Sequence, residues 1–412
     1  MSDTARSCEF VRTLNVSPER AYYAFTNTAA VGEWFCNGME ADVSEDGRLH
    51  CGRLYFWWND GSYASGEFRA LKENEAIEYT WNGRDDPGPT TVSVSFEPDG
   101  EGTRLTLKHG GLGCGDDWDA LMERIKVRWT EGLENLASVL ETGIDLREAR
   151  RPIMGFVSPG PITEENAAQY NLPQDTRGMI VGSIVPGSGA EAAGLQSNDV
   201  LHSLNRVVAD GSATYRQALA GKHAGDTVEV VYSRGGEQHT TQMELSAVPL
   251  ADVPPAAPEL AEAVKQIYAQ LDADLDEILN GVSEAEASHR PAAGEWSAKE
   301  VLCHLIDIER HHIITWISVL VSGWDMMIRP GNVQARIEAL LVVYPTLDDL
   351  RAELSRSHRE TVELLARLPE EFVKRKSTYW RVGQVVLQAM HPRLHCAQIR
   401  EAIETARQQS LL

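Results

Sequence analysis

A proline-rich segment divides this chain more clearly than any other feature of its sequence. Residues 249–258, PLADVPPAAP, contain four of the 18 prolines and a single charged residue. This composition favours a stiff, extended linker over a helix or a strand. A softer boundary lies at residues 143–152, where a long helical pattern ends at a glycine and a charged stretch meets Pro152. A chain of 412 residues has room for roughly two to four domains, and we expect three, at residues 1–145, 150–248 and 258–412.

Charge and composition exclude several classes of partner. The net charge is −23 at pH 7 and none of the three expected domains is basic, so we expect no nucleic-acid partner. The longest apolar stretch, residues 313–321, is about half as long as a membrane crossing requires. The start, MSDTARSCEF, lacks the basic and apolar regions of a secretory signal, and the six cysteines form no CxxC pair. We therefore expect a cytoplasmic protein with reduced thiols and no membrane span.

The first domain has the pattern of an antiparallel sheet followed by a long helix. Short alternating runs bounded by Gly, Asn, Asp or Pro predict strands at residues 8–16, 48–58, 63–71, 76–81, 90–97 and 103–109. Ser17 and Pro18 are typical of a helix start. Apolar residues at helical spacing through residues 117–141 predict a helix long enough to lie across the sheet. The predicted fold class is α+β.

This domain resembles the START-like superfamily, in the branch related to the activator of the heat-shock protein 90 ATPase. The resemblance rests on SPERAYYAFTN near the start, GTRLTLKHGG at residues 102–111 and WTEGLENLASVLETG at residues 129–143. It implies a helix-grip fold with a cavity for an apolar small molecule between helix and sheet. The aromatic residues expected to line this cavity are Tyr55, Trp57, Tyr79 and Trp81. The alternative is that these rings are plain core, as aromatics at strand spacing usually are.

The second domain is predicted to be mainly β with two short helices. Its segments RGMIV, VPGS, AAGL and NDVL, between residues 177 and 201, resemble PDZ domains of the bacterial HtrA-protease type. Asn198 and Arg206 stand at turn positions where that family commonly has glycine. Arginine adopts left-handed backbone less readily than asparagine, so the turn at Arg206 is where this chain can depart from the family.

The PDZ resemblance implies that the domain binds the C-terminal peptide of a protein partner. Residues 151–156, RPIMGF, fall on the loop whose backbone N–H groups receive the terminal carboxylate, and we expect contacts at Met154, Gly155 and Phe156. The helix at residues 213–219 would form the other wall, with Tyr215 and Leu219 facing the peptide. The alternative is a domain that is only a rigid spacer or that docks internally. An open sheet edge, which is otherwise a liability, favours peptide binding.

The third domain reads as an all-α four-helix bundle. Apolar residues recur at helical spacing through residues 260–279, 301–320, 350–368 and 382–403, with proline or glycine between the runs. Ser297 with Glu300 predicts a capping box at the start of the second helix, and Thr346 with Asp349 a similar start for the third.

Two segments of this domain resemble the DinB superfamily of four-helix bundles. They are EWSAKEVLCHLIDIE at residues 295–309 and HPRLHCAQIR at residues 391–400. The resemblance implies that His304, His391 and His395 bind one divalent metal ion and leave one coordination position open. Two histidines four residues apart share a helix face, and a third from a facing helix completes a site suited to zinc, nickel or iron.

One residue conflicts with this metal site. Pro392 follows His391 directly and should kink the helix or restart it with His391 as a cap. His311, seven residues beyond His304, is therefore a substitute ligand, and a metal-free bundle is the alternative to the whole site. Asp307 and Glu309 are candidates for supporting the ligands. The other histidines, among them His109 and His358, lack ligand spacing and are expected at the surface or in turns.

Two functions of different classes fit these patterns. The first is a cytoplasmic ligand-binding and adaptor protein that combines a hydrophobic-ligand cavity, a peptide-binding PDZ module and a metal-binding bundle. The second is a metal-dependent enzyme of the DinB kind, for which the resemblance implies thiol transfer or hydrolysis. No segment supplies a serine triad, which disfavours proteolysis.

Overall fold

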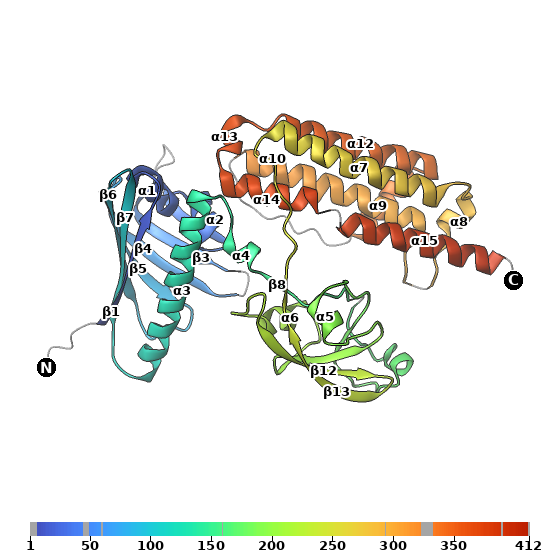
Figure 1. Ribbon diagram of the computed structural model, residues 1–412, viewed down its shortest axis with the longest axis horizontal. Helices are drawn as coiled ribbons and strands as arrows, with labels where there is room; N and C mark the ends of the chain where they lie inside the picture. Colours follow the sequence, from blue (N-terminus) through green and yellow to red (C-terminus); the bar gives the residue numbers. More distant parts are fainter. Residues whose placement is uncertain are drawn as a thin grey trace.

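The computed structural model describes residues 6–43, 49–58, 61–158, 160–292, 294–322, 333–388 and 390–410. Figure 1 shows three parts in chain order: a curved sheet gripping a long helix, a small β part, and an all-helical part. The predicted fold classes are confirmed. In the described ranges no helix combines the length and the apolar character that a membrane span requires.

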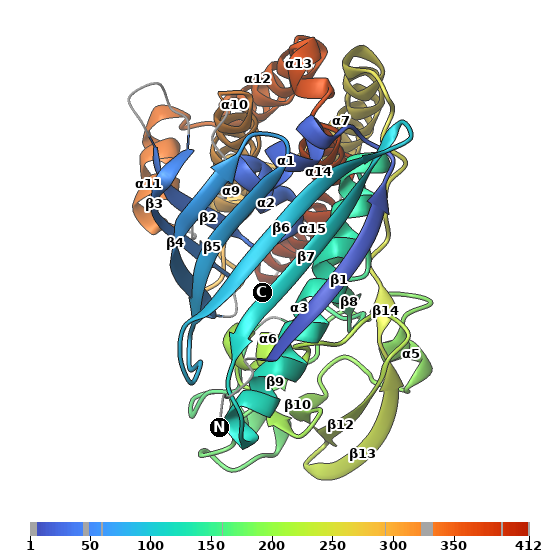
Figure 2. The same ribbon diagram turned by 90° about the vertical axis from the view of Figure 1, so that its left-hand side faces the viewer.

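The first part is one antiparallel sheet wrapped around α3. Its strands lie in the order β1-β7-β6-β5-β4-β3-β2 (Figure 2). The elements are β1 (Arg6–Leu14), α1 (Pro18–Thr26), α2 (Thr28–Trp34), β2 (Gly38–Val43), β3 (Leu49–Trp57), β4 (Tyr63–Lys72), β5 (Ala76–Gly83), β6 (Thr90–Asp99), β7 (Gly102–Leu112) and α3 (Asp116–Glu141). The strand β2 has no counterpart in the sequence prediction. Ser17 caps α1 through its hydroxyl and Pro18 takes the first turn, as expected.

Aromatic side chains fill the space between α3 and the sheet. Trp129 on α3 stacks on Phe35, with ring centroids 4.7 Å apart and planes 8° apart, and also contacts Trp81 on β5. His109 is fully buried in this core. The expectation that it lies at the surface or in a turn was wrong. His109 is held in the core because the indole N–H of Trp129 donates to its Nδ1 over 3.0 Å.

The second part is a small sheet in the order β11-β10-β12-β13, with β9 beside β10 and a separate β8–β14 pair. Its elements are α4 (Leu146–Ala149), β8 (Pro152–Ile153), a 3₁₀ turn (Ala167–Tyr170), β9 (Met179–Ile180), α5 (Gly189–Ala192), β10 (Val200–Leu204), β11 (Val207–Val208), α6 (Ser212–Ala218), β12 (Thr227–Arg234), β13 (Glu237–Glu244) and β14 (Ser246–Ala247). Asn205 and Arg206 both have positive φ, 49° and 64°. These left-handed residues form the tight turn between β10 and β11, so arginine takes the backbone that glycine would favour.

The third part is a helical bundle. Its elements are α7 (Ala257–Leu279), α8 (Glu284–Ser288), α9 (Ala298–Ile308), a π-helical turn (Glu309–Ile314), α10 (Thr315–Val321), α11 (Gln334–Val343), α12 (Leu347–Ala366), α13 (Glu370–Val373), α14 (Lys376–Leu387) and α15 (Met390–Ser410). Both capping boxes are confirmed, at Ser297 and at Thr346. The run expected as one helix at residues 382–403 is two helices, because α14 ends at Leu387 and α15 starts at Met390.

The proline-rich segment lies along α14 (Figure 1) and is not a free spacer. The side-chain amide of Gln384 accepts a hydrogen bond from Ala251 N over 2.8 Å and donates to Ala251 O over 2.7 Å. Tyr379 Oη donates to Pro254 O over 2.9 Å. Gly383 admits Val253 so closely that a Cβ at this glycine would lie 2.3 Å from it. The helix therefore supplies the hydrogen bonds that an extended segment cannot make within itself.

Candidate functional site

Helices α9 and α15 carry the three histidines predicted to bind metal. His304 lies in the second turn of α9, whose start is fixed by the Ser297 capping box. His391 and His395 lie in the first two turns of α15, four residues apart on one helix face. Pro392 falls in the first turn of this helix, where a backbone N–H has no intrahelical acceptor and its absence costs nothing. The predicted restart occurs, but with His391 inside the helix and not at its cap.

The three imidazoles converge through their Nε2 atoms. His391 Nε2 lies 3.1 Å from His395 Nε2 and 3.5 Å from His304 Nε2, and all three ligand atoms lie within 4.8 Å of one another. Two nitrogens bound to one tetrahedral zinc ion would be about 3.4 Å apart, from bond lengths of about 2.1 Å. His304 is buried and His391 exposed, so the group opens towards solvent on one side. The donor set and its spacing fit one divalent ion.

Neighbouring groups keep these imidazoles neutral and oriented. Burial, reinforced by the neighbouring imidazoles of His395 and His391, lowers the pKa of His304 to about 4. Burial also lowers the pKa of His395. His395 Nδ1 donates to Gln398 Oε1 over 2.8 Å, which leaves the Nε2 lone pair facing the other two rings. The ring of Trp296 packs against His304 with centroids 5.0 Å apart. Neutral imidazoles with directed lone pairs are the form that coordinates metals.

The other residues that the sequence suggested for this site have different partners. Asp307 forms an ion pair with Arg336, and its Oδ1 lies 3.0 Å from His311 Nδ1. His311 is therefore not in the histidine group, and it was wrong as a substitute ligand. A π-helical turn begins at Glu309 and rotates His311 off the face of His304. Gln398 was missed as a supporting residue, although its place three residues after His395 puts it on the same helix face.

Glu309 belongs to a separate buried network in the bundle. Its Oε1 accepts a hydrogen bond from Tyr268 Oη over 2.8 Å and another from Thr361. Burial raises the pKa of Glu309. His358, expected at the surface, stacks on the Tyr268 ring with centroids 4.2 Å apart. These contacts give Glu309 a structural role within the described residues and no contact with the three-histidine group.

The predicted carboxylate loop of the PDZ part contains a glycine that no other residue can replace. Gly155 has a φ of 88°, and a Cβ there would lie 2.1 Å from the Ser188 side chain. Met154 is buried in the core of this part. The rings and side chains of Phe156, Tyr215 and Leu219 pack against the same core. The structure thus brings all five residues predicted to bind peptide to one region.

Phe156 presents an open strand edge. It pairs with Ile184 in an antiparallel bridge, flanked by hydrogen bonds from Val157 N to Ser183 O over 2.9 Å and from Val185 N to Gly155 O over 2.8 Å. In this pattern Phe156 occupies the non-hydrogen-bonded pair, so its own N–H and C=O point away from Ile184. In the described chain no acceptor lies opposite this N–H. An added strand can use both groups.

The cavity prediction for the first part is wrong for two of its four residues, and the interior space beside a third, Tyr79, is too small for a ligand. Tyr55 is 39% exposed, and Tyr55 and Trp57 lie on the outer face of the sheet, while Phe56 is buried on the inner face. Tyr79 and Trp81 do point inward and are buried. The interior void beside Tyr79, however, is only about 10 Å³, far below the roughly 300 Å³ of the smallest ordinary ligand pockets. Aromatic rings fill the space that the resemblance assigned to a ligand.

A larger hollow of about 520 Å³ lies at the margin between α3 and the β4–β5 end of the sheet. Trp81, Leu121 and Ile125 form its apolar wall, and Arg124 and Arg128 reach it from α3. Arg128 lies over the Trp58 ring at 4.4 Å. This hollow combines an apolar wall with both guanidinium and carboxylate groups, and Arg124 pairs with Asp86 over 3.3 Å.

Comparison with known proteins assigns each part to a family. Residues 15–141 match the activator of Hsp90 ATPase homolog 1-like proteins, residues 143–245 match the PDZ domain, and residues 266–399 match the DinB superfamily. Each match covers less than half of the chain.

Similar proteins cover single parts only. A probable periplasmic serine protease of Haemophilus influenzae is 26% identical over 111 residues, 27% of this chain and 23% of that protein. A Do-like serine protease HtrA of Lactococcus lactis is 31% identical over 99 residues, 23% of this chain and 24% of that protein. This chain thus spans about a quarter of the length of these relatives.

Two solved structures are similar over about a third of this chain. The Aha1 dimer from Colwellia psychrerythraea is 20% identical, over 34% of this chain and 98% of that one, with a TM-score of 0.29. An HSP90 activator from Plasmodium falciparum is 25% identical, over 32% and 95%, with a TM-score of 0.27. The family matches alone show that the chain joins a domain of the activator of Hsp90 ATPase homolog 1-like family, a PDZ domain resembling those of HtrA proteases, and a DinB-superfamily domain.

Proposed function

We propose that this protein is an adaptor that holds one divalent metal ion in its DinB domain and recruits a protein partner through its PDZ domain. The observation that carries the proposal is the convergence of three Nε2 atoms from His304, His391 and His395. The domains that we propose to cooperate are residues 1–145, 150–248 and 258–412. The proline-rich segment supports the boundary between the last two, because its residues 249–256 contain no helix or strand and α7 begins at Ala257.

Zinc, nickel and iron are the ions that suit three imidazole ligands. A bound ion would act as a Lewis acid with a coordination position open to water or to a substrate atom. The protein's own contribution is to hold three neutral rings in place. Gln398 fixes the ring of His395, and Trp296 packs against that of His304.

Metal analysis of the full chain tests the metal centre. The wild type, expressed with added zinc, nickel or iron, should retain about one ion per chain, and chelation should lower its melting temperature. His304→Ala and His395→Ala should lose the ion. His223→Ala, a substitution in the PDZ domain, is the matched control and should retain it. Substoichiometric metal in the wild type together with unchanged melting on chelation would leave a metal-free bundle.

The open edge at Phe156 supports C-terminal peptide binding by strand addition. The backbone near Gly155 would receive the terminal carboxylate, and Tyr215 with Leu219 would select an apolar terminal side chain. A display screen of free C-termini against the full chain measures this. Gly155→Val should abolish binding through the clash with Ser188. Equal binding of amidated and free-acid peptides would contradict the carboxylate role.

A metal-dependent enzyme of the DinB kind is a second candidate function, favoured by the solvent-facing side of the histidine group at His391. Thiol transfer to an electrophile, or hydrolysis, would then depend on the ion. A panel of small thiols with an electrophile, assayed with metal-loaded chain and with His304→Ala, distinguishes the two functions. Turnover by the wild type that is absent from the variant would establish the enzyme. No turnover by either would favour the adaptor.

We further propose that the first domain binds a small molecule in the hollow at the margin between α3 and the sheet. The wall of Trp81, Leu121 and Ile125 suits an apolar molecule, and the three arginines and two aspartates that also line the hollow leave a net positive charge that favours an anionic group on it. Native mass spectrometry before and after organic extraction would detect such a ligand, and Leu121→Trp should exclude it by filling the hollow. The bare mass in every sample, with no binding of an anionic apolar dye, would contradict this part.

A further inference from the structure

Three aromatic rings lie on the outer face of the first sheet, on the side opposite α3. The Tyr55 ring stacks beside Trp57 with centroids 6.1 Å apart and planes 24° apart, and beside Tyr63 at 5.8 Å and 31°. Tyr55 and Tyr63 are each 39% exposed. Gly38 allows Trp57 to lie across the edge strand β2, because a Cβ at Gly38 would meet the indole at 1.9 Å. We call these three rings the outer platform. Exposed aromatic clusters of this kind mark binding surfaces.

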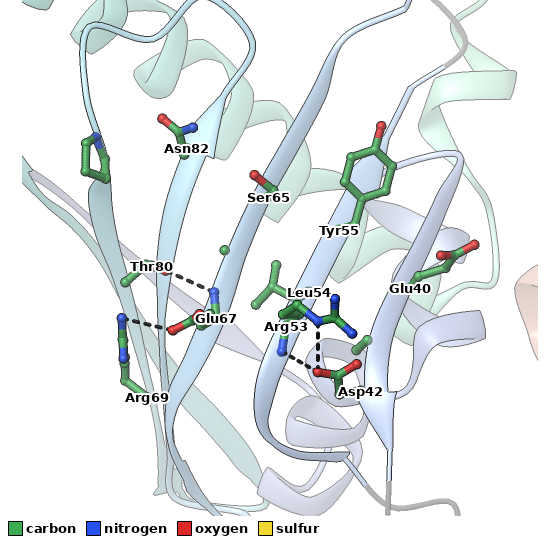
Figure 3. A pocket seen from close by; sticks show the side chains of 13 residues that line it. Glu40, Asp42, Arg53, Leu54, Tyr55, Ser65, Glu67, Arg69, Thr80 and Asn82 are labelled. Atoms are coloured by element: carbon green, nitrogen blue, oxygen red, sulfur yellow. Dashed lines mark hydrogen bonds and ion pairs between the residues drawn. The ribbon is translucent and has the colours of Figure 1, made fainter.

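The outer platform borders a hollow of about 820 Å³ (Figure 3). One row of side chains crosses four strands through the paired residues Glu40, Tyr55, Ser65 and Asn82. The strand β4 is irregular here. Its pairing with β5 shifts in register between Phe68 and Ala70, and Thr80 Oγ1 accepts the hydrogen bond of Glu67 N over 2.9 Å. Such irregularities bend a strand and reshape the face of a sheet.

Charges in the hollow are balanced except at one carboxylate. Arg53 Nε lies 3.4 Å from Asp42, and Arg69 lies 3.0 Å from Glu67. Glu40 forms no ion pair with any residue that the structure describes. It stands on β2 beside Tyr55 on β3, on the same face (Figure 3). A carboxylate next to an exposed aromatic ring is an arrangement that attracts a cationic side chain.

We propose that the outer platform and its hollow bind a basic, proline-containing segment of a partner protein in the polyproline II conformation. Proline-rich segments dock on exposed aromatic rings because their extended helix is preformed and loses little entropy on binding. Glu40 takes an arginine or lysine of the segment. Ser65 and Asn82 offer donors for its carbonyl groups, which proline leaves unpaired. The negative charge of Glu40, which no arginine of the hollow balances, disfavours phosphate-bearing ligands.

The outer platform is independent of the PDZ site, because it would bind an internal segment of a partner and the PDZ site would bind a C-terminus. Fluorescence anisotropy of the full chain with a labelled, C-terminally amidated peptide of Pro-Pro-Arg repeats is the test. Amidation removes the carboxylate that the PDZ loop would bind. We expect saturable binding that weakens with salt, and weakening of about tenfold or more when alanine replaces the prolines or glutamate replaces the arginines.

Two variants locate the binding. Tyr55→Ala and Glu40→Lys should each weaken it by about tenfold or more. Glu78→Lys is the matched control, since Glu78 lies on the same outer face of β5 but outside the hollow, and it should leave binding unchanged. Melting curves identify any variant that fails to fold, in which case Tyr55→Phe with Glu40→Gln replaces it.

Three outcomes would overturn the proposal. The first is absence of binding by the Pro-Pro-Arg peptide. The second is equal binding of the peptide with alanine for proline. The third is equal weakening by Glu40→Lys and Glu78→Lys, which would mean diffuse attraction to an acidic surface. Binding that depends on proline, arginine, Tyr55 and Glu40 together supports it.

Discussion

Protonation of His109 should destabilise the first domain at acid pH. The hydrogen bonds around the ring fix its tautomer. The Trp129 indole donates to Nδ1 over 3.0 Å, so Nδ1 carries no proton and Nε2–H donates to Thr90 Oγ1 over 2.8 Å. Thr90 in turn donates to Trp81 O over 3.2 Å. A second proton would break the Trp129 hydrogen bond and bury a charge near Arg128. Burial, and then Arg128, lower the pKa of His109 to about 4.

The loss of stability at acid pH can be calculated from the lowered pKa of His109. The unfolded chain binds this proton at a pKa of about 6.5, and one pKa unit is worth about 1.4 kcal/mol. Because the folded pKa is depressed, the unfolded state binds more protons between pH 6.5 and 4. Stability from His109 is therefore fully present above pH 6.5 and is lost as the pH falls to about 4. The loss should amount to about 2 kcal/mol at pH 5 and about 3 kcal/mol below pH 4.

Histidine-selective NMR of the full chain tests this reasoning. The His109 ring signal, assigned with His109→Gln, should remain that of a neutral imidazole down to pH 5. The variant should also lose about one proton's worth of the pH dependence of unfolding in the window from pH 6.5 to 4. A His109 titration midpoint at pH 6 or above, or the same pH slope in both proteins, would refute the claim that the ring is buried neutral.

Three further substitutions have defined outcomes. Gln398→Met should weaken zinc binding by about 10- to 100-fold, measured by competition with a chromophoric chelator, because the His395 ring loses its acceptor. Gln384→Leu should release the proline-rich segment from α14 and speed its proteolysis, as both hydrogen bonds to Ala251 are lost. Glu33→Ala should loosen the first domain from the bundle, because Glu33 accepts from Thr378 on α14, and small-angle scattering should show a larger radius of gyration.

The sequence was sufficient to predict most strands and helices of the first domain. It was not sufficient to predict which side chains of each strand face the core. Most expected strands agree with the structure to within a few residues, because each contains clear alternation. Residues 55–58, YFWW, are four aromatics in succession, and either phase of alternation satisfies them. The pairing of Phe56 with Met39 on β2, a strand without a clear signal, decides which of these rings face inward. Which side chains of β3 face the core therefore depends on its pairing with β2, and the sequence of β3 alone does not decide it.

The histidine group was predictable for a different reason. The resemblance to the DinB superfamily implied the three ligands, and the four-residue spacing of the two on α15 agrees with helical geometry. The exclusion of His311 required the π-helical turn at Glu309, which leaves no mark in the apolar pattern. Pro392 correctly predicted that the helix is interrupted. It did not predict where α14 ends or that His391 lies inside α15.

The helix α14 contacts the first domain and the proline-rich segment, and it directly precedes the helix that carries two of the three histidines. Its first turn contacts the first domain, where Thr378 donates to Glu33. Its second and third turns hold the proline-rich segment through Tyr379 and Gln384. It ends at Leu387, three residues before the start of α15, whose second residue is His391. The separation of His391 from His304, 3.5 Å between Nε2 atoms, therefore depends on the position of α14 in the bundle. The contacts that hold the domains against α14 therefore also influence the positions of His391 and His395, which both lie beyond its end on α15.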